Sequence, residues 1–300
     1  MSTSFANLKR SRKSSLDKLL SESSKVSGGE QNGRDDRFWT PEVDKAGNGY
    51  AVIRFLPAPQ GEDIPWVRIF THGFQGPGGW FINNSLTTLG KKDPVSEHNT
   101  SLWNRGDDAG KDLARKQKRR LTYISNIYVV TDPAHPENEN KVFLYKYGKR
   151  IYDKLNDLMN PEFEDEDPRN PFDLWEGSNF KVKIRNVQGY RNYDKSEFET
   201  PSELVKDDDD KMEELWKSEY SLQEFLDPKH FKSYDELKVQ LNRVLGLDGS
   251  DPKPSTTADS EDNPFEAAPV VDTPKQSTTD KSSDDDDNLS FFQNLADEDD

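Results

Sequence analysis

The stretch KRRLTYISNIYVVTDPAHPENENKVFLYKYGKRIYDKLNDLM, residues 118–159, decides the fold. Branched and aromatic residues fill Leu121–Val130 and again Lys141–Tyr147, and a Pro- and Asn-rich segment separates the two runs, which predicts two β-strands joined by a turn. From Arg150 to Met159 the apolar residues take up helical spacing, and Pro161 ends the pattern. The stretch therefore predicts a strand, a turn, a strand and a helix in succession.

The same patterns extend outward along the chain. Four further runs predict strands, at Ala51–Leu56, Trp66–Phe70, Trp80–Ile82 and Phe180–Val187. Helical spacing returns between Ser202 and Leu226, and a last helix begins at a Ser233/Glu236 capping box and ends at Gly246. Because strands come first and helices later, we expect a mainly β fold with helical additions (α+β), built as a small antiparallel barrel or open sheet.

Charge divides the chain into three parts. Only 31% of the 300 residues are hydrophobic, so we expect some of the chain to be disordered. Residues 251–300 contain 15 acidic and 3 basic side chains, whereas residues 1–20 have a net charge of +4. We expect a basic arm at 1–36, a folded core at 37–250 and a disordered acidic tail at 251–300. With no cysteine, no long apolar run and no secretory signal, we expect an intracellular protein without disulfides or a membrane span.

Both terminal parts carry short apolar motifs. In the arm, Ser14 and Asp17 have capping-box spacing ahead of three leucines, which predicts an amphipathic helix too short to form alone in water. In the tail, Phe291, Phe292 and Leu295 interrupt the acidic residues. These residues are either incidental in a solubilising tail or a docking motif for a partner protein.

Three basic stretches of the core are interleaved with tyrosines, at Lys111–Arg120, Lys141–Lys154 and Lys181–Lys195. Cations can follow a phosphodiester backbone while rings stack on unpaired bases, each stack contributing about 1–3 kcal/mol without reading sequence. Any one stretch is more often a solvated basic face with core aromatics behind it. Their recurrence in an acidic chain favours a single-stranded nucleic acid as the ligand.

Catalytic motifs are missing from the sequence. There is no phosphate-binding glycine loop, no nucleophile elbow and no metalloprotease motif. The acidic runs at 164–167 and 207–210 are consecutive, so their carboxylates diverge rather than converge on a metal ion. The four histidines lack ligand spacing, and each is expected in a loop or on the surface. We expect no enzyme, no catalytic residue, no metal and no cofactor.

Three further segments carry the same family resemblance as residues 118–159: GNGYAVIRFLP at 47–57, THGF at 71–74 and WEGSNFKVKIRNVQGYRNYDKSEF at 175–198. Together they closely resemble the single-stranded DNA-binding proteins of T-even-type bacteriophages, over nearly the whole core. The resemblance implies an OB-fold core with a small appended subdomain and a cleft for single-stranded DNA. It also implies a protein that coats DNA in phage replication, recombination and repair, in the cytoplasm of the infected bacterial host.

The resemblance, together with the basic stretches and the charge and aromatic residues of the tail, assigns expected roles to individual residues. The arm would drive cooperative self-association through Lys9, Arg10, Arg12, Lys13, Ser14 and Ser15. The tail would recruit replication proteins (polymerase, helicase loader, recombinase mediator) through Phe291, Phe292 and Leu295, and by its charge would compete for the cleft. The cleft aromatics would be Trp103, Tyr123, Tyr145, Tyr190 and Tyr193. The cleft bases would be Arg54, Lys116, Lys118, Arg119, Arg120, Lys146, Lys149 and Arg191.

One departure from the family concerns a metal site. Many members hold a structural zinc with one histidine and three cysteines, and of these this chain has only His72, with Ser85, Asp93 and Ser96 at the cysteine places. Serine does not replace a thiolate, so we expect no zinc and a subdomain held by burial of Trp80, Phe81 and Leu86. Two other functions stay open from the residues alone: an RNA-binding protein, and an acidic interaction scaffold that binds no nucleic acid.

Overall fold

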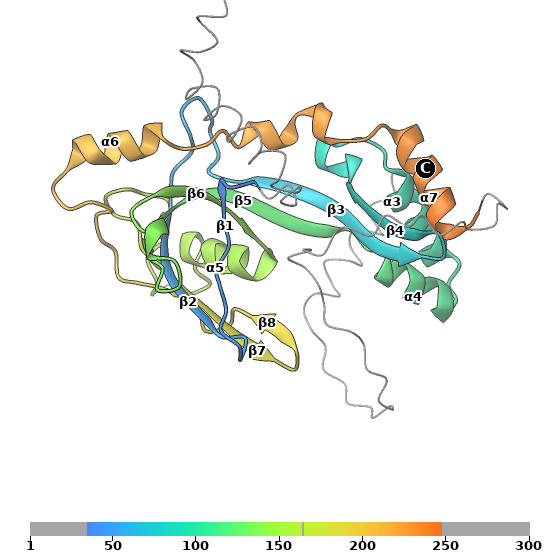
Figure 1. Cartoon of the computed structure of the whole chain (residues 1–300), viewed down its shortest axis with the longest axis horizontal. Coiled ribbons are helices and arrows are strands. Elements are labelled where there is room, and N and C mark those ends of the chain that lie inside the picture. Colours follow the sequence, from blue (N-terminus) through green and yellow to red (C-terminus); the bar gives the residue numbers. More distant parts are fainter. Residues whose placement is uncertain (1–34, 164, 248–300) are drawn as a thin grey trace, which may run out of the picture. The chain divides into compact units, whose positions relative to one another are not determined.

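The computed structural model describes residues 35–163 and 165–247 (Figure 1). Residues 37–247 lie in one compact unit. The predictions for the arm and for the tail, including the self-association and docking residues, lie outside the described residues. None of the helices in the described part is long and apolar enough to span a bilayer.

The fold is α+β, as predicted, and centres on one mixed sheet. Its main path runs β1 (Phe38–Trp39), β6 (Val142–Tyr147), β5 (Arg120–Thr131), β2 (Gly49–Phe55), β7 (Phe180–Val187) and β8 (Tyr190–Asn192). Strand β3 (Val67–Gly76) pairs with β5 and with β4 (Gly79–Asn84), and β9 (Glu197–Phe198) pairs with β7. All pairs are antiparallel except β1–β6. The structure contains a strand at each of the six predicted positions, and the OB-fold assignment stays a prediction.

Strand β5 has partners on both edges. One edge pairs with β6 from Tyr123 to Tyr128, while the other edge pairs first with β3 and then with β2. Every residue from Thr122 to Val129 is buried. Because β3 pairs with only the first part of this edge, it continues past β5, and from Thr71 to Gly76 it pairs with β4.

The described helices are α3 (Pro94–Asn104), α4 (Asp108–Lys116), α5 (Lys149–Met159), α6 (Asp209–Lys217) and α7 (Tyr234–Leu245), with short 3₁₀ turns η1 (Leu86–Leu89), η2 (Pro136–Asn138), η3 (Gln223–Leu226) and η4 (Pro228–His230). Helix α5 was predicted, as was α7 with its Ser233/Glu236 capping box and left-handed Gly246. The predicted helical zone from Ser202 to Leu226 is wrong in extent, because only α6 and η3 form within it. Helices α3 and α4 were not predicted.

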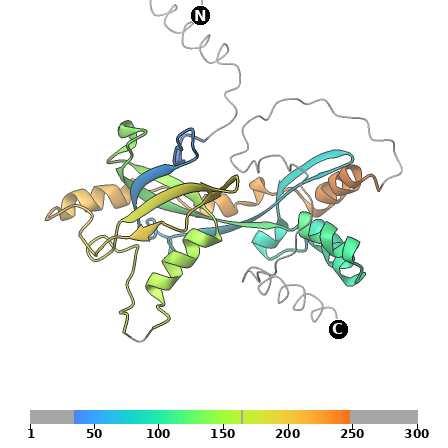
Figure 2. The ribbon, with the colours of Figure 1, turned by 90° about the horizontal axis from the view of Figure 1, so that it is seen from below.

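The sheet has two faces with different covers. On the α5 face, Ile151 and Leu155 of α5 pack with Phe55 and Ile127. On the opposite side, which we call the η3 face, Leu222 packs on strands β3, β5 and β6. Figure 2 shows α5 beside β5, and α7 beside the β3–β4 hairpin.

The β3–β4 hairpin has its own core with α3 and α7. Phe74 and Phe81 stack with ring centroids 5.1 Å apart, and Leu86, Leu237 and Val244 pack around them. The predicted burial of Phe81 and Leu86 is therefore confirmed. The predicted burial of Trp80 is wrong: the side chain is 57% exposed because successive residues of a strand point to opposite sides, and Phe81 takes the inner one.

Glu219 is a buried carboxylate without a hydrogen-bond partner among the described residues. Its neighbour Glu62 is better satisfied, since it accepts hydrogen bonds from the Ser221 hydroxyl at 2.7 Å and the Leu222 amide at 2.9 Å. Burial, and then the charge of Glu62, raises the pKa of Glu219 to about 9. Glu219 is thus protonated in the folded protein at neutral pH.

This pKa gives a signed prediction for stability. In the unfolded chain a glutamate has a pKa of about 4.3, so the contribution of protonated Glu219 is complete below that pH and is lost as the pH rises towards 9. We expect Glu219→Gln to raise the free energy of unfolding at pH 8, by on the order of 1–3 kcal/mol, and to change little at pH 4. Urea unfolding at both pH values measures this, with the exposed Glu213→Gln as control. Equal stabilities at pH 8 would contradict it.

Candidate nucleic-acid interface

Four tyrosine rings form a row across the α5 face of the sheet, which we call the tyrosine row. Tyr145 and Tyr147 of β6 lie 5.5 Å apart, Tyr147 lies 5.7 Å from Tyr123 of β5, and Tyr123 stacks on Tyr152 of α5 at 4.0 Å with nearly parallel planes. The strand register explains the row, because Tyr123 and Tyr147 are directly paired. Burial, followed by Tyr152, raises the pKa of Tyr123 to about 12, so its hydroxyl keeps its proton.

Cations lie beyond one end of the tyrosine row. Arg68 is exposed and directly opposite Tyr123 in the β3–β5 register. Arg119, just before β5, holds its guanidinium carbon 4.0 Å from the centroid of the Phe70 ring. Burial lowers the pKa of Arg119, and the charge of Asp93 opposes that change. Two guanidinium groups and a half-buried phenyl ring thus border the tyrosines on this side.

The other end of the tyrosine row meets the β7–β8 hairpin. Burial raises the pKa of Tyr145, and the nearby charge of Arg191 opposes the rise. Arg191 also hydrogen-bonds to Tyr193, which packs on the same core. Tyr190 is 62% exposed beside a tight turn in which Gln188 and Gly189 have positive φ. This end combines an exposed ring, a half-buried ring and an exposed cation.

A second aromatic and basic cluster lies on the helices. The Trp103 ring of α3 has the Arg115 guanidinium 5.6 Å away and the Lys111 ammonium 6.0 Å away, both from α4. Lys116 and Lys118 are exposed at the end of α4 and just after it. These residues form one cluster because α3 and α4 pack together. The place of Trp103 among the cleft aromatics, which the resemblance implies, stays a prediction.

Three of the predicted bases lie on the η3 face instead. Directly paired residues point to the same side of a sheet, and Arg120 pairs with Thr71, Lys146 with Ile124 and Arg54 with Tyr128. Lys146 lies over Phe38, which belongs to the η3-face core. The prediction that all the bases converge on one surface is therefore wrong for these three, because neighbours in a strand alternate between its faces.

Arg54 is also completely buried. Its guanidinium donates to the Ser202 carbonyl oxygen, and burial lowers its pKa to about 10, opposed by the charges of Asp173 and Glu199. In this conformation Arg54 holds the segment at Ser202 against β2 and does not reach a surface that DNA can touch. The prediction that it binds DNA does not agree with this burial.

Burial also divides the predicted aromatics. Tyr123 and Tyr145 are almost fully buried in the α5-face core, so the core interpretation of an aromatic stripe applies to them. Tyr190 and the half-buried Tyr193 stay accessible. Lys149 is exposed at the start of α5 and pairs with Asp153 at 3.3 Å.

The residues that sequence reasoning missed are Arg68, Phe70 and Tyr152. They lie in two separate segments, β3 and α5, and only the β3–β5 register and the packing of α5 bring them to the tyrosine row. A prediction of which strands pair would have placed Arg68 opposite Tyr123.

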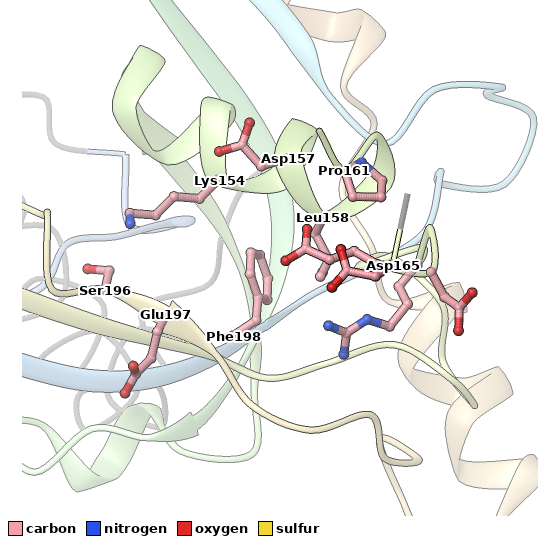
Figure 3. Close-up of a pocket in the computed structure, with 11 residues that line it drawn as sticks. Lys154, Asp157, Leu158, Pro161, Asp165, Ser196, Glu197 and Phe198 are labelled. Atoms are coloured by element: carbon pink, nitrogen blue, oxygen red, sulfur yellow. The ribbon is translucent and has the colours of Figure 1, made fainter. Parts of the chain in front are cut away.

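A hollow of about 560 Å³ lies away from the tyrosine row, between the end of α5, the following loop and β9 (Figure 3). Five acidic side chains and two basic ones line it, together with an apolar patch: Lys154, Asp157, Leu158, Pro161, Asp165, Glu166, Asp167, Arg169, Ser196, Glu197 and Phe198. Its acidic lining would repel a polyanion. The hollow is therefore not part of the candidate interface.

The residues at the places of the family's zinc ligands, as the resemblance gives them, do come together, around a buried carboxylate. Asp93 Oδ2 accepts from the Ser85 hydroxyl at 2.8 Å and the Leu86 amide at 2.9 Å. Its Oδ1 is 3.1 Å from His72 Nε2 and accepts from the amides of Val95 and Ser96. Burial raises the pKa of Asp93, but the hydrogen bonds from His72, Ser96 and Ser85 outweigh it and hold the pKa well below its usual range. We call this set the Asp93 cluster.

The Asp93 cluster does not fit a zinc ion. Both carboxylate oxygens already accept hydrogen bonds from protein donors, and the remaining groups are two serines and one imidazole, without a thiolate. The general expectation of a loop or surface histidine is wrong for His72, which is buried, and of the two alternatives for this position, a leftover or a packing residue, burial agrees with the second. The carboxylate therefore joins the strand, the 3₁₀ turn and the start of α3, which is the role a structural metal has elsewhere.

Comparisons with known proteins agree with one another. Residues 47–245 match the family model described as "gp32 DNA binding protein like". The single-stranded DNA-binding protein of Enterobacteria phage T2 is 37% identical over 243 residues, which cover 78% of this chain and 79% of the relative. That of Enterobacteria phage T4 is 37% identical over 242 residues with the same coverage. That of Escherichia phage SV14 is 36% identical over 91 residues, 29% of this chain and 80% of the relative.

The Asp93 cluster gives a prediction about metal dependence. EDTA is expected to leave the thermal unfolding midpoint unchanged, because no contact in the cluster needs a metal.

Asp93→Asn is expected to cost about 2–4 kcal/mol of unfolding free energy, since the amide turns its N–H donors towards other buried donors. The control is Asp107→Asn, at an exposed helix start without a side-chain capping bond. A lower midpoint in EDTA that zinc restores would contradict the prediction.

Proposed function

The chain belongs to the gp32-type DNA-binding protein family, and from this membership we propose that it binds single-stranded DNA without sequence preference and without catalysis. The observation that carries the proposal is the tyrosine row, with Arg68 and Arg119 beyond one end and Tyr190 and Arg191 beyond the other. Its relatives from phages T2 and T4 are named single-stranded DNA-binding proteins. The sheet in this proposal is the OB-fold implied by the resemblance.

In this mechanism the rings and the cations have separate tasks. The exposed and half-buried rings, above all Tyr190, Tyr193 and Phe70, stack on unpaired bases, and the guanidinium groups meet phosphates. The buried tyrosines support the accessible rings from below and keep the surface rigid. Neither task reads base edges, which supports binding to any sequence.

We extend the proposal to the terminal segments and the biological setting. The arm makes binding cooperative by contacting a neighbouring copy, so that the protein coats single strands during phage replication, recombination and repair in the cytoplasm of the infected bacterium. The tail, with 15 acidic residues, competes with DNA for the basic surface and recruits polymerase, helicase loader or recombinase mediator when displaced. The basis for the arm, the partners and the setting is family membership.

Binding is expected to depend on salt and on Tyr190. Counterion release makes the logarithm of the affinity fall with the logarithm of salt concentration, with a slope of about −0.7 per neutralised phosphate. Tyr190→Ala is expected to lose about 1–3 kcal/mol of binding free energy, through one lost stack. Fluorescence quenching with a single-stranded homopolymer measures both quantities.

The matched control for Tyr190 is Tyr50→Ala. Tyr50 is also an exposed strand tyrosine, but it alternates with Ala51, which packs in the α5-face core, and so points to the other side of the sheet. Its replacement is expected to leave binding unchanged. Salt-independent binding, or equal losses in the two variants, would count against the proposed surface.

The two ends of the chain are expected to act in opposite directions. Deletion of residues 1–20 should abolish clustering on long strands and keep the affinity for a short oligonucleotide that holds one copy. Truncation at Asp251 should raise the affinity, most strongly at low salt, because a net charge of −12 is removed. Electron microscopy of long strands and oligonucleotide titration separate the two effects. Clustering that persists without the arm would refute its role.

A further inference from the structure

A chain of hydrogen bonds links the Asp93 cluster to Arg119 at the candidate interface. Arg119 Nη1 donates to Thr87 Oγ1. The Thr87 hydroxyl is 2.9 Å from the Ser85 hydroxyl, and the Ser85 hydroxyl donates to Asp93 Oδ2 at 2.8 Å. Four side chains, from η1, its N-cap, the N-cap of α3 and the residue before β5, are thereby joined.

Chemistry fixes the direction of the protons in this chain. Asp93 is ionised and can only accept, and a guanidinium can only donate. Ser85 therefore gives its single hydroxyl proton to Asp93, which leaves its oxygen to accept the Thr87 proton. Thr87 then has only acceptor capacity left, and this is what Arg119 uses. All the hydrogen bonds between these four side chains therefore donate in the same direction, from Arg119 towards Asp93, and each bond strengthens the next.

We propose that Thr87 and Ser85 are positioning residues, which hold the Arg119 guanidinium above Phe70 in the orientation in which it meets a DNA phosphate. The inference rests on the proposed function and adds to it a specific arrangement within the interface. Asp93 supplies the balancing negative charge from the interior, where DNA cannot reach it. Neither Thr87 nor Ser85 belongs to a basic or aromatic motif.

The physical benefit is preorganisation. A free arginine loses the freedom of several torsions when it binds a phosphate, which costs about 0.5–1.5 kcal/mol for each side chain that becomes fixed. The hydrogen-bond chain and the contact with Phe70 fix Arg119 before DNA arrives. Without the Thr87 hydroxyl, Arg119 loses one of the contacts that fix it, and more of this ordering cost falls on DNA binding.

The decisive variant is Thr87→Val, which keeps the shape of the side chain and removes the hydroxyl. The backbone amide of residue 87 still caps η1 through the Ser85 hydroxyl. We expect Thr87→Val to weaken binding to a single-stranded homopolymer about three- to tenfold at fixed salt, with an unchanged unfolding midpoint. Thr87→Ser should restore the wild-type affinity. The control is Thr100→Val, a half-buried threonine of α3 whose hydroxyl donates to the Ser96 carbonyl oxygen of the same helix at 2.9 Å.

A double-mutant cycle tests whether the effect passes through Arg119. Arg119→Met alone should weaken binding and reduce the salt slope by about 0.7, for one phosphate contact. Adding Thr87→Val to Arg119→Met should then have no further effect. Additive losses, or wild-type affinity in Thr87→Val, would overturn the proposal. If instead Arg119→Met itself binds as wild type, the placement of Arg119 in the interface fails, and the hydrogen-bond chain has no function in binding.

A measurement without DNA separates this inference from the proposed function. The guanidinium protons of Arg119 should give resolved, slowly exchanging NMR signals in the wild type and in Thr87→Ser, and should lose them in Thr87→Val. Retained signals in Thr87→Val would overturn the positioning role even if the protein binds single-stranded DNA as proposed. If Thr87→Val loses these signals but the wild-type protein does not bind single-stranded DNA, the hydrogen-bond chain holds Arg119 as proposed but has no role in DNA binding.

Discussion

Strand β5 must satisfy hydrogen bonds on both of its edges, and the rest of the structure follows from how it does so. Its 12 residues are longer than β6 or β2, so one edge serves β2 and β3 in turn. Strand β3 consequently runs past β5 and pairs there with β4 alone, and the hairpin acquires a separate core with α3 and α7. The same pairing brings Arg68 beside Tyr123, so one ladder builds both the scaffold and the edge of the interface.

Burial of β5 on both faces explains why the interface has aromatic rings at its centre and cations at its ends. A guanidinium in the middle of this sheet would lose its hydration without a partner, as Arg54 illustrates with two guanidinium nitrogens that have none among the described residues. Tyrosine fits the same positions because its ring packs and its hydroxyl finds local partners, such as Ser125 for Tyr147 at 2.8 Å. The cations therefore lie where β3, β5 and the β7–β8 hairpin reach solvent.

Local patterns in the sequence were sufficient for the strands, for α5 and for α7, because each of them has apolar residues at the period of its own backbone. Helices α3 and α4 escaped because their buried residues are largely polar or small, such as Ser96, Asn99 and Gly110. Alternation alone separates Arg120 from Tyr123 and Lys146 from Tyr145, but the face of Arg54 relative to the tyrosines could not be predicted. A cluster of bases along the chain is split by alternation within a strand, and only the pairing register decides which members meet.

The Asp93 cluster shows how a carboxylate can take the place of a structural metal and add a connection that a metal would lack. A zinc ion is satisfied by four ligands, and the network ends at those ligands and the groups that orient them. A carboxylate accepts from several donors, and each hydroxyl among those donors can accept in turn, as Ser85 does from Thr87. The network can therefore continue outward until it meets a group that only donates. In this protein the group that only donates is the Arg119 guanidinium. The Asp93 cluster at the centre of the subdomain and Arg119 at the edge of the interface therefore share one set of hydrogen bonds.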